Sequence, residues 1–326
     1  MTAAQKEVRA VADLDRVLVL AGGLSPEHEV SVQSGRSVAE ALRRLDVEVQ
    51  VADVDSGLLQ RLADDPPQVV FPVLHGSAGE DGAIREVLEL AGVSYVGARP
   101  QSCRLAYAKP AAKALLAEKG VRVPRGATLP KSAFHDLGAP ALLDKLIERL
   151  GLPLFVKPDR GGSAFGATPV TSAKDLSTAL MSCFAYSDSA LVEELVQGTE
   201  LAVGVLDTGS GPVALPPVEI VPDGGVYDYA ARYTAGRTEF FCPARLEESV
   251  LAAATEVALT AHRALGLRDL SRTDLMVAPD GEVVFLETNV APGLTETSTF
   301  PMAAAAQGLD FAVLCRELAH QAHLRG

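Results

Sequence analysis

Three side chains near the end of the sequence have the types and spacing of a metal site. Glu287 and Asn289 close the apolar run "VVFLETN", and residues two apart in a strand lie on the same face. The segment 272–287 has the pattern of a hairpin that turns at an Asp-Gly pair, which would bring Asp274 opposite Glu287. Hard oxygen ligands of this kind suit Mg²⁺, whose shell is completed by phosphates and water. A solvated hairpin end with unused acidic residues explains any one of them, but the three together favour a metal site.

A second group of residues suits a polyphosphate. Lys157 ends an apolar strand, and the glycine-rich stretch 156–166 that contains it also carries the hydroxyl of Ser163. Backbone amides of such a loop can wrap phosphate oxygens while one lysine supplies a point charge. A hairpin tip that carries a surface lysine and binds no phosphate explains this stretch equally well. Lys109, in the preceding helix, could reach the same phosphates.

The segment "LVEEL" (191–195) offers groups for a nucleoside. It ends a strand with a carboxylate and with backbone groups of the kind that contact an adenine edge. Glu200 follows five residues after Leu195, where a ribose diol could be bound. Each of these features is ordinary alone, but together with the loop and the acidic hairpin they predict a nucleotide site closed by Mg²⁺.

The first third of the sequence has the pattern of a parallel sheet that could position further ligand-binding residues. Strands and helices alternate there, which implies right-handed crossovers. Ligands of such sheets lie beyond the carboxyl ends of the strands, where Glu29 and His75 stand. The expected elements are strands at 16–23, 47–54, 68–76 and 93–97 and helices at 31–45 and 82–92.

The remaining two thirds have the pattern of an α+β arrangement with an antiparallel sheet. We expect three domains, at 1–99, 100–194 and 195–326, of which the second carries the glycine-rich loop and the third the metal site. The expected elements are a helix and a strand in 108–129, a polar connector at 130–140, a helix at 141–151, a hairpin at 152–170, two strands in 190–206, a long loop at 223–243 and helices at 247–265 and 301–322.

Composition narrows the class of protein. The 326 residues are 48% hydrophobic and 22% charged, with no apolar run near the roughly 20 residues of a membrane span. The start of the sequence lacks the apolar core of a signal peptide, so we expect a cytoplasmic enzyme without a membrane partner. A net charge of −13 argues against nucleic-acid binding. The cysteines have no CxxC spacing, which predicts neither a zinc site nor disulfides; they are Cys103, Cys183, Cys242 and Cys315.

At this point the sequence resembles a known family. The segments "AGGLSPEHEVSVQSG", "HGSAGEDG", "FVKPDRGGSAFG", "GGVYDYAARYTAGRTEFFCPA" and "RTDLMV...FLETNVAPGLTETS" are similar to successive motifs of D-alanine:D-alanine ligases, which belong to the ATP-grasp superfamily. The likeness extends from about residue 16 to 320. It implies a three-domain ATP-grasp architecture in which the nucleotide lies between the second and third domains. It also implies that ATP phosphorylates one D-alanine and that the amine of a second D-alanine attacks the acylphosphate.

The resemblance further implies roles for individual residues. Those implied for substrate binding are Glu29 at the first ammonium, His75 in the same subsite and Ser298 at the second carboxylate. Those implied for ATP are Lys109 and Lys157 at the phosphates and Glu193, Glu194, Leu195 and Glu200 at the adenosine. Those implied for Mg²⁺, with Mn²⁺ as the alternative ion, are Asp274, Glu287 and Asn289.

The resemblance also implies that the protein is a homodimer. It further implies catalytic roles for several residues. Arg272 and the amide of Gly293 would stabilise negative charge on the phosphoryl group and the oxyanion. Tyr233 matches the family tyrosine that meets the positions of Glu29 and Ser163, and the 223–243 loop that carries it would close over the site.

The sequence also departs from the family pattern and leaves alternatives open. A phosphate-loop glutamate and serine, a lysine and an aspartate of the family are replaced by Gly161, Ala164, Arg232 and Ala108. One alternative is a related ligase that joins D-alanine to D-lactate, D-serine or another amino acid, or a specialised paralogue. Another is a nucleotide-binding protein without catalysis, against which the retained metal ligands and arginine argue. The Tyr-rich loop favours D-alanyl-D-alanine synthesis.

Overall fold

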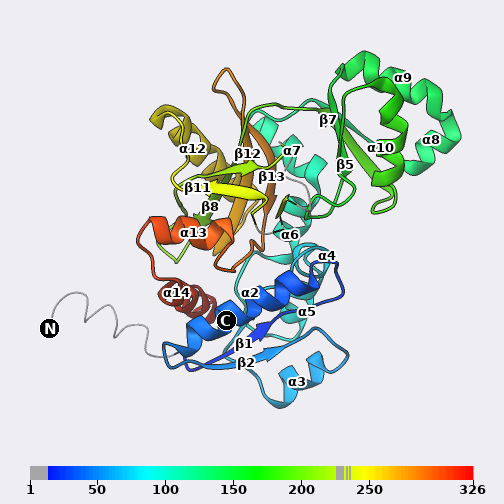
Figure 1. Cartoon of the computed structure of the whole chain (residues 1–326). Helices are drawn as coiled ribbons and strands as arrows, with labels where there is room; N and C mark the ends of the chain where they lie inside the picture. Colours follow the sequence, from blue (N-terminus) through cyan, green and yellow to red (C-terminus); the bar gives the residue numbers. More distant parts are fainter. Residues whose placement is uncertain (1–13, 225–230, 233, 235, 326) are drawn as a thin grey trace.

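The computed structural model describes residues 14–224, 231–232, 234 and 236–325, and this part of the chain contains three β-sheets (Figure 1). The N-terminal sheet lies at the bottom of the view, the C-terminal sheet in the middle and the central sheet at the upper right. The expected order of a parallel α/β region followed by antiparallel sheets is confirmed. No helix in the described part has the length and apolar character needed to cross a bilayer.

The N-terminal sheet is parallel, with strand order β2-β1-β3. Alternate residues of β1 pack toward α2 on one face and toward α3 and α5 on the other. The strand expected at 93–97 is reduced to one parallel bridge between Val70 and Tyr95, so that expectation was wrong. The elements are β1 (Arg16–Leu20), α2 (His28–Arg43), β2 (Glu48–Ala52), α3 (Leu58–Asp64), β3 (Val69–Pro72), α4 (Ser77–Glu80) and α5 (Ala83–Leu90).

A tight turn after β1 brings the start of α2 to the carboxyl ends of the strands. Gly22 has a φ of 106°, and a Cβ at this position would lie 2.5 Å from the carboxyl group of Asp53. The hydroxyl of Ser31 accepts a hydrogen bond from the Gly22 amide at 2.8 Å and donates one to the Val73 carbonyl at 2.9 Å. These bonds fix the first turns of α2 beside the ends of β1 and β3, where parallel sheets bind ligands.

The central sheet is antiparallel, in the order β4-β7-β5-β6, and its helices form a separate hydrophobic cluster with it. The hairpin expected at 152–170 is confirmed by the pairing of β5 with β6. The connector expected at 130–140 is instead largely helical: α8 ends at Leu137, Gly138 follows with a φ of 88°, and α9 begins at Ala139. The elements are β4 (Gly126–Pro130), α8 (Lys131–Leu137), α9 (Ala139–Leu150), β5 (Leu154–Pro158), β6 (Thr168–Val170), a 3₁₀ turn (Ala173–Asp175), α10 (Leu176–Cys183) and β7 (Ser189–Glu194).

The C-terminal sheet is also antiparallel, with the path β11-β10-β8-β12-β13 and β9 paired to β8. A strand, β11, forms within the region expected as a loop at 223–243. The helix expected at 301–322 is two helices, because Gly308 with a φ of 80° ends the first. The elements are β8 (Thr199–Leu206), β9 (Val213–Ala214), β10 (Val218–Pro222), β11 (Thr238–Phe241), α12 (Glu248–Ala264), β12 (Leu270–Val277), β13 (Val283–Asn289), α13 (Thr299–Ala306) and α14 (Phe311–His323).

Helices tie the C-terminal sheet to the N-terminal one. α14 packs beside α2, and its residue Leu318 shares a buried cluster with Leu42 (Figure 1). α6 (Pro100–Tyr107) and α7 (Lys109–Glu118) pack against β13, and Leu116 of α7 lies in the same cluster as Phe285. The domain limits expected from the sequence stay predictions.

Candidate active site

Two cavities adjoin where the three sheets meet. The large cavity has a volume of about 560 Å³ and the small cavity about 350 Å³. The large cavity lies beyond the carboxyl ends of the N-terminal strands, and the small cavity lies between residues of the central and C-terminal sheets. Both are lined by the same five residues, which are Lys109, Gly161, Gly162, Arg232 and Glu287. A group held by these residues would be accessible from both cavities.

The acidic hairpin has the predicted geometry. Asp274 on β12 pairs directly with Glu287 on β13, and Gly281 turns the hairpin with a φ of 84°. The register shifts between Asp274 and Leu275, so β13 has one extra residue, Leu286. Such a bulge re-aims side chains: Leu286 and Glu287 both line the small cavity, while Phe285 is fully buried in the core.

Cations already neutralise both hairpin carboxylates. The guanidinium of Arg272 binds Asp274 through two bonds, Nε to Oδ1 at 2.6 Å and Nη2 to Oδ2 at 2.8 Å. Lys109 Nζ lies 3.3 Å from Oε2 of Glu287. Burial opposes ionisation of Glu287, but Lys109, Lys157 and nearby arginines outweigh it and lower its pKa to about 2. Glu287 is therefore a carboxylate at every physiological pH.

The three predicted metal ligands surround the junction of the cavities. Glu287 lines both cavities, Asp274 lines the small one and Asn289 lines the large one. Asn289 Oδ1 accepts a hydrogen bond from the Ala291 amide at 2.7 Å, which fixes the carboxamide. Two carboxylates and one carboxamide are oxygen donors of the kind that Mg²⁺ prefers. Among the described residues no group of three or more His, Cys, Asp or Glu side chains is arranged to hold a metal ion, so the predicted site depends on the Asn289 carboxamide as well.

The glycine-rich loop separates the two cavities. Ser163 faces the large cavity and Ala164 the small one, and both have positive φ, of 52° and 57°. Lys109 Nζ donates to the Gly161 carbonyl, which joins α7 to the loop. Lys157 lines the small cavity and is 8% exposed. Both predicted lysines thus line the small cavity beside the loop, and Lys109 also lines the large one.

The residues predicted for a nucleoside all line the small cavity: Glu193, Glu194, Leu195 and Glu200. Burial raises the pKa of Glu200 to about 7, although Arg232 opposes the shift. Apolar walls that sequence reasoning missed come from Phe155, Met276 and Leu286. Strand alternation could have indicated two of them, because Phe155 precedes Lys157 by two residues and Met276 follows Asp274 by two.

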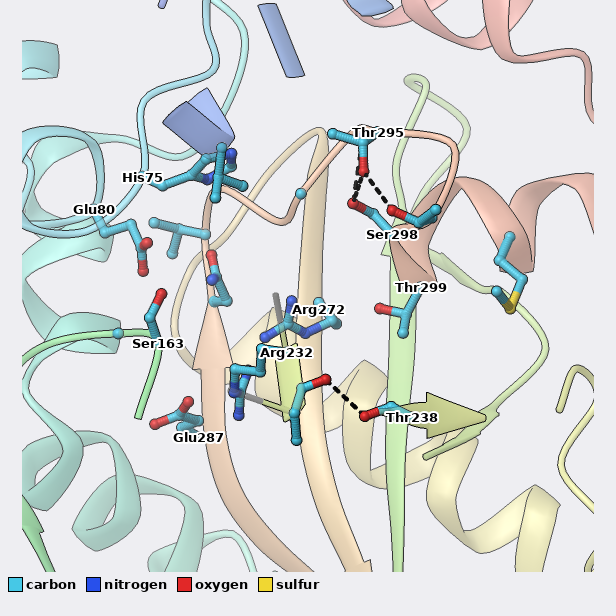
Figure 2. A pocket seen from close by; sticks show the side chains of 18 of the residues that line it. His75, Glu80, Ser163, Arg232, Thr238, Arg272, Glu287, Thr295, Ser298 and Thr299 are labelled. Carbon is cyan, nitrogen blue, oxygen red and sulfur yellow. Dashed lines mark hydrogen bonds between the residues drawn. The ribbon is translucent and has the colours of Figure 1, made fainter. Parts of the chain in front are cut away.

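The opposite ends of the large cavity differ in chemistry. Figure 2 shows His75 and Glu80 on one side, Ser298 and Thr299 on the other, and Arg272 between them. His75 Nε2 lies 3.1 Å from Ser34 Oγ and its Nδ1 2.9 Å from the Ala291 carbonyl. Burial lowers the pKa of His75 to about 4, so the ring is neutral near pH 7.

A cluster of hydroxyl side chains lines the end of the large cavity opposite His75. Ser298 precedes α13 as its N-cap, and its Oγ lies 2.8 Å from Thr295 Oγ1 (Figure 2). A Cβ on Gly293 would lie 2.6 Å from Ser298 Oγ, so the backbone at this position passes close to the serine. Gly293 and Ser298 are therefore adjacent in the wall of the large cavity, which Thr295 and Glu296 also line.

Comparison with known proteins decides the family. The model described as "D-ala D-ala ligase C-terminus" matches residues 115–320, and that described as "D-ala D-ala ligase N-terminus" matches 59–98. A D-alanine--D-alanine ligase of Bordetella petrii is 39% identical over 309 residues, which are 95% of this chain and 92% of that protein. The chain belongs to the D-alanine–D-alanine ligase family.

Other members of the D-alanine–D-alanine ligase family agree in sequence and structure. A D-alanine--D-alanine ligase of Nitratidesulfovibrio vulgaris is 40% identical, with 93% of this chain and 96% of that protein covered. The D-alanine--D-alanine ligase structure from Bacillus anthracis has a TM-score of 0.80 at 26% identity, covering 95% of this chain and 98% of that one. The VanG D-Ala:D-Ser ligase structure from Enterococcus faecalis has a TM-score of 0.80 at 29% identity, covering 93% and 98%. The resemblance drawn from the motifs is confirmed.

One predicted site residue of this ligase-family chain lies away from the cavities. The side chain of Glu29 is 88% exposed, with its Oε1 3.7 Å from His28 Nδ1, and it lines neither cavity. Residues two apart at the start of a helix point in different directions, so Glu27 and Glu29 cannot both face inward. The buried one is Glu27, which is 4% exposed.

Sequence reasoning missed an acidic pair: Glu80 lines the large cavity, and Glu27 lies beside it, close to Gly76 and Gly162, without lining either cavity. A Cβ on Gly76 would lie 2.5 Å from Glu27 Oε2, and one on Gly162 would lie 3.5 Å from Glu27 Oε1 and 3.7 Å from Glu80 Oε1. Glu80 accepts a hydrogen bond from the Gly76 amide at 2.8 Å. Burial, with the negative charge of Glu27 adding to it, raises the pKa of Glu80 to about 7. Two carboxyl groups beside the glycine-rich loop suit a cationic ligand.

The predicted lid is only partly described. Tyr233 lies outside the described residues, and so do 225–230. Arg232 lines both cavities, and Figure 2 shows it between Arg272 and Glu287. The arginine that replaces a family lysine therefore stands at the junction of the cavities, where an anionic group would meet it.

Proposed function

We propose that this protein joins two D-alanine molecules to D-alanyl-D-alanine, for peptidoglycan precursors, with ATP converted to ADP and phosphate. The observation that supports this most directly is the junction of the two cavities. Lys109, Arg232 and Glu287 line both of them, so a phosphoryl group at the end of a nucleotide in one cavity could reach a carboxylate in the other.

The small cavity is the proposed ATP site. Phe155, Met276 and Leu286 would offer apolar surfaces to the adenine, and Glu200, which lines the same cavity, would bind a ribose hydroxyl. Lys109, Lys157 and amides of the glycine-rich loop would bind the phosphates.

Mg²⁺, or Mn²⁺ in its place, is proposed at Glu287, Asp274 and Asn289. The oxygen donor set and the ionised state of Glu287 fit such an ion. When bound, the metal would neutralise phosphate charge during transfer. Arg272 and Lys109, which now pair with the two carboxylates, would then be available to phosphate oxygens.

The large cavity is the proposed site of both amino acids. Glu27, rather than Glu29, would bind the ammonium of the first D-alanine, with neutral His75 beside it. Ser298 and the N-terminus of α13 would bind the carboxylate of the second. The Gly293 amide and Arg272 would stabilise an oxyanion between them. Tyr233 and Ser163 would complete the wall when the loop closes.

The proposed chemistry has two steps. A carboxylate oxygen of the first D-alanine attacks the γ-phosphorus of ATP, and the bond to ADP breaks. The uncharged amine of the second D-alanine then attacks the acyl carbon and gives up one proton, and phosphate leaves with that proton as the tetrahedral intermediate collapses. Two arginines line this cavity, and their charge favours the neutral amine over the ammonium.

A second candidate is a ligase that takes D-serine as the acceptor. Thr299 lines the cavity beside Ser298 and directs its side chain inward (Figure 2), and one structural relative is a D-Ala:D-Ser ligase. An ADP-release assay with single D-amino acids and pairs, with the products separated chromatographically, tests both. We expect D-alanyl-D-alanine to predominate, at a rate that rises from pH 6 to 9. Mixed products with D-serine would support the second candidate, and depsipeptide with D-lactate at pH 7 would contradict both.

We also propose a cytoplasmic homodimer without nucleic-acid or membrane partners. The proposed use of ATP supports a cytoplasmic location, and the net charge of −13 argues against nucleic-acid binding. Light scattering after size-exclusion chromatography would give the mass of the assembly directly, and a monomer at micromolar concentration would contradict the dimer.

A further inference from the structure

A buried lysine stands behind the small cavity without lining it. Lys113 follows Lys109 by one turn of α7 and is 5% exposed. Its Nζ forms an ion pair with Oε2 of Glu193, and Lys157 Nζ binds the other oxygen, Oε1, at 2.6 Å. Glu193 and Lys157 line the small cavity, whereas Lys113 does not. One carboxylate is thus shared between a lysine at the cavity wall and a lysine behind it.

The cluster places two lysines around one carboxylate in a buried setting. Burial lowers the pKa of Lys113 to about 7, and Lys157 adds to that effect while Glu193 opposes it. Burial acts against ionisation of Glu193 too, but the two lysines outweigh it and lower its pKa. Each oxygen of Glu193 is held by a different cation, so the carboxylate cannot rotate without losing a buried ion pair. Its orientation at the cavity is therefore fixed from behind.

Lys113 also connects two parts of the molecule. α7 packs with the C-terminal sheet, whereas Glu193 is on β7 and Lys157 on β5, adjacent strands of the central sheet. The ion pair therefore joins the two walls between which the small cavity lies. Without Lys113, Lys157 alone would pair with Glu193. That pairing would draw the positive charge of Lys157 away from the cavity.

We infer that Lys113 is a positioning residue for the nucleotide: it holds Glu193 in place so that Lys157 keeps a net positive charge for the phosphates. This inference rests on the proposed function, because it takes the small cavity as the ATP site. Lys113 would act on nucleotide binding through Glu193, and the large cavity would be unaffected.

The first test compares Lys113→Met, which removes the charge at similar length, with Lys113→Arg, which keeps it. We expect Lys113→Met to raise the KM for ATP by about tenfold, the loss typical of one hydrogen bond to a charged group, and to leave the KM for D-alanine within about twofold. Lys113→Arg should recover most of the ATP affinity. Equal changes in both KM values, or no change in either, would overturn the inference.

A double-mutant cycle separates positioning from a general structural role. In a Glu193→Gln background the further change Lys113→Met should alter the ATP dissociation constant, measured by calorimetry, by less than about twofold. The same tenfold loss in both backgrounds would show that Lys113 does not act through Glu193. If Lys113→Met does not fold, as judged by circular dichroism, Lys113→Gln replaces it in the same cycle.

The wild-type protein distinguishes the two levels of failure. If it binds ATP and forms dipeptide while the Lys113 variants behave like wild type, the positioning inference alone is wrong. If calorimetry detects no ATP binding to the wild-type protein, the proposed function fails and the inference fails with it.

Discussion

Asp274 and Glu287 lie opposite each other on β12 and β13, and each carboxylate is paired with a different cation, Arg272 for the first and Lys109 for the second. The two pairs come from different elements, since Arg272 is on the hairpin itself and Lys109 is on α7. A divalent cation that entered here would compete with both, and the displaced side chains would remain next to its ligands. Binding of such a cation would therefore release two positive charges toward the adjoining cavities.

The first prediction concerns Glu287→Gln. The variant should fold normally and lose ADP formation by about 100-fold or more, because an amide cannot supply the second negative ligand for a hard cation. Glu282→Gln is the matched control, since Glu282 is exposed on the same hairpin and pairs with Arg122. Steady-state ADP release in saturating Mg²⁺ is the measurement, and turnover near that of wild type would contradict the metal assignment.

The second prediction sets Glu27 against Glu29. Glu27→Gln should raise the KM of the first D-alanine by about tenfold to a hundredfold, because a buried ammonium loses its charged partner. Glu29→Gln should leave the KM within about twofold, because its carboxylate is in solvent. Initial rates at varied D-alanine give both values. The reverse order would restore the assignment made from the sequence.

The third prediction concerns Ala164→Ser in the glycine-rich loop. Ala164 faces the small cavity, so an added hydroxyl could reach a phosphate and tighten ATP binding by about 0.5 to 1.5 kcal/mol. Ala164→Gly serves as the control, because it relaxes the positive φ of 57° without adding a donor. Calorimetric titration with ATP compares the three proteins. A gain in the glycine variant alone would assign the effect to backbone strain.

The fourth prediction concerns the pH dependence of stability. Burial raises the pKa of Glu80 from 4.5 to about 7, so between these values the folded state binds more protons than the unfolded state. The free energy of unfolding contributed by this group is therefore full below about pH 4.5 and falls as pH rises through 7. Glu80→Gln should remove that fall and be more stable than wild type at pH 8 by up to about 3 kcal/mol.

Denaturant unfolding at pH 5 and pH 8 measures this difference. Glu118→Gln is the control, because Glu118 is exposed at the end of α7. His75 has the opposite sign, since its lowered pKa makes stability fall as pH drops from about 6.5 to about 4, but it is present in all three proteins and cancels. A wild type and a Glu80 variant with parallel pH profiles would refute the prediction.

Sequence patterns predicted the parts of the site that are set locally. The Asp-Gly turn and the strand period were enough to place Asp274 opposite Glu287, and the apolar strand before Lys157 was enough to place the glycine-rich loop. The bulge at Leu286 was not predictable, because nothing in an apolar run marks which residue is left unpaired.

Contacts between distant segments were not predictable. Glu27 and Glu29 have the same side chain, and only the turn after β1 decides which of them is buried. Lys113 and Glu193 are 80 positions apart, and their ion pair depends on how α7 packs against the C-terminal sheet. The division of the helix expected at 301–322 depends on Gly308, which an apolar periodicity alone does not reveal.

The return of α14 to α2 has a mechanical consequence. It fastens the N-terminal and C-terminal sheets together at a second place, so the large cavity between them has a fixed span. The central sheet, whose hydrophobic cluster contains only its own residues, is joined to the rest by two short chain crossings, before β4 and after β7, and by polar contacts such as those of Lys109 and Lys113. The central sheet is thus the smaller of the two bodies on either side of the small cavity, and the N-terminal and C-terminal sheets together form the larger. A nucleotide bound in the small cavity would contact both of its walls. ATP itself would then set how rigidly the central sheet is held against the rest of the protein.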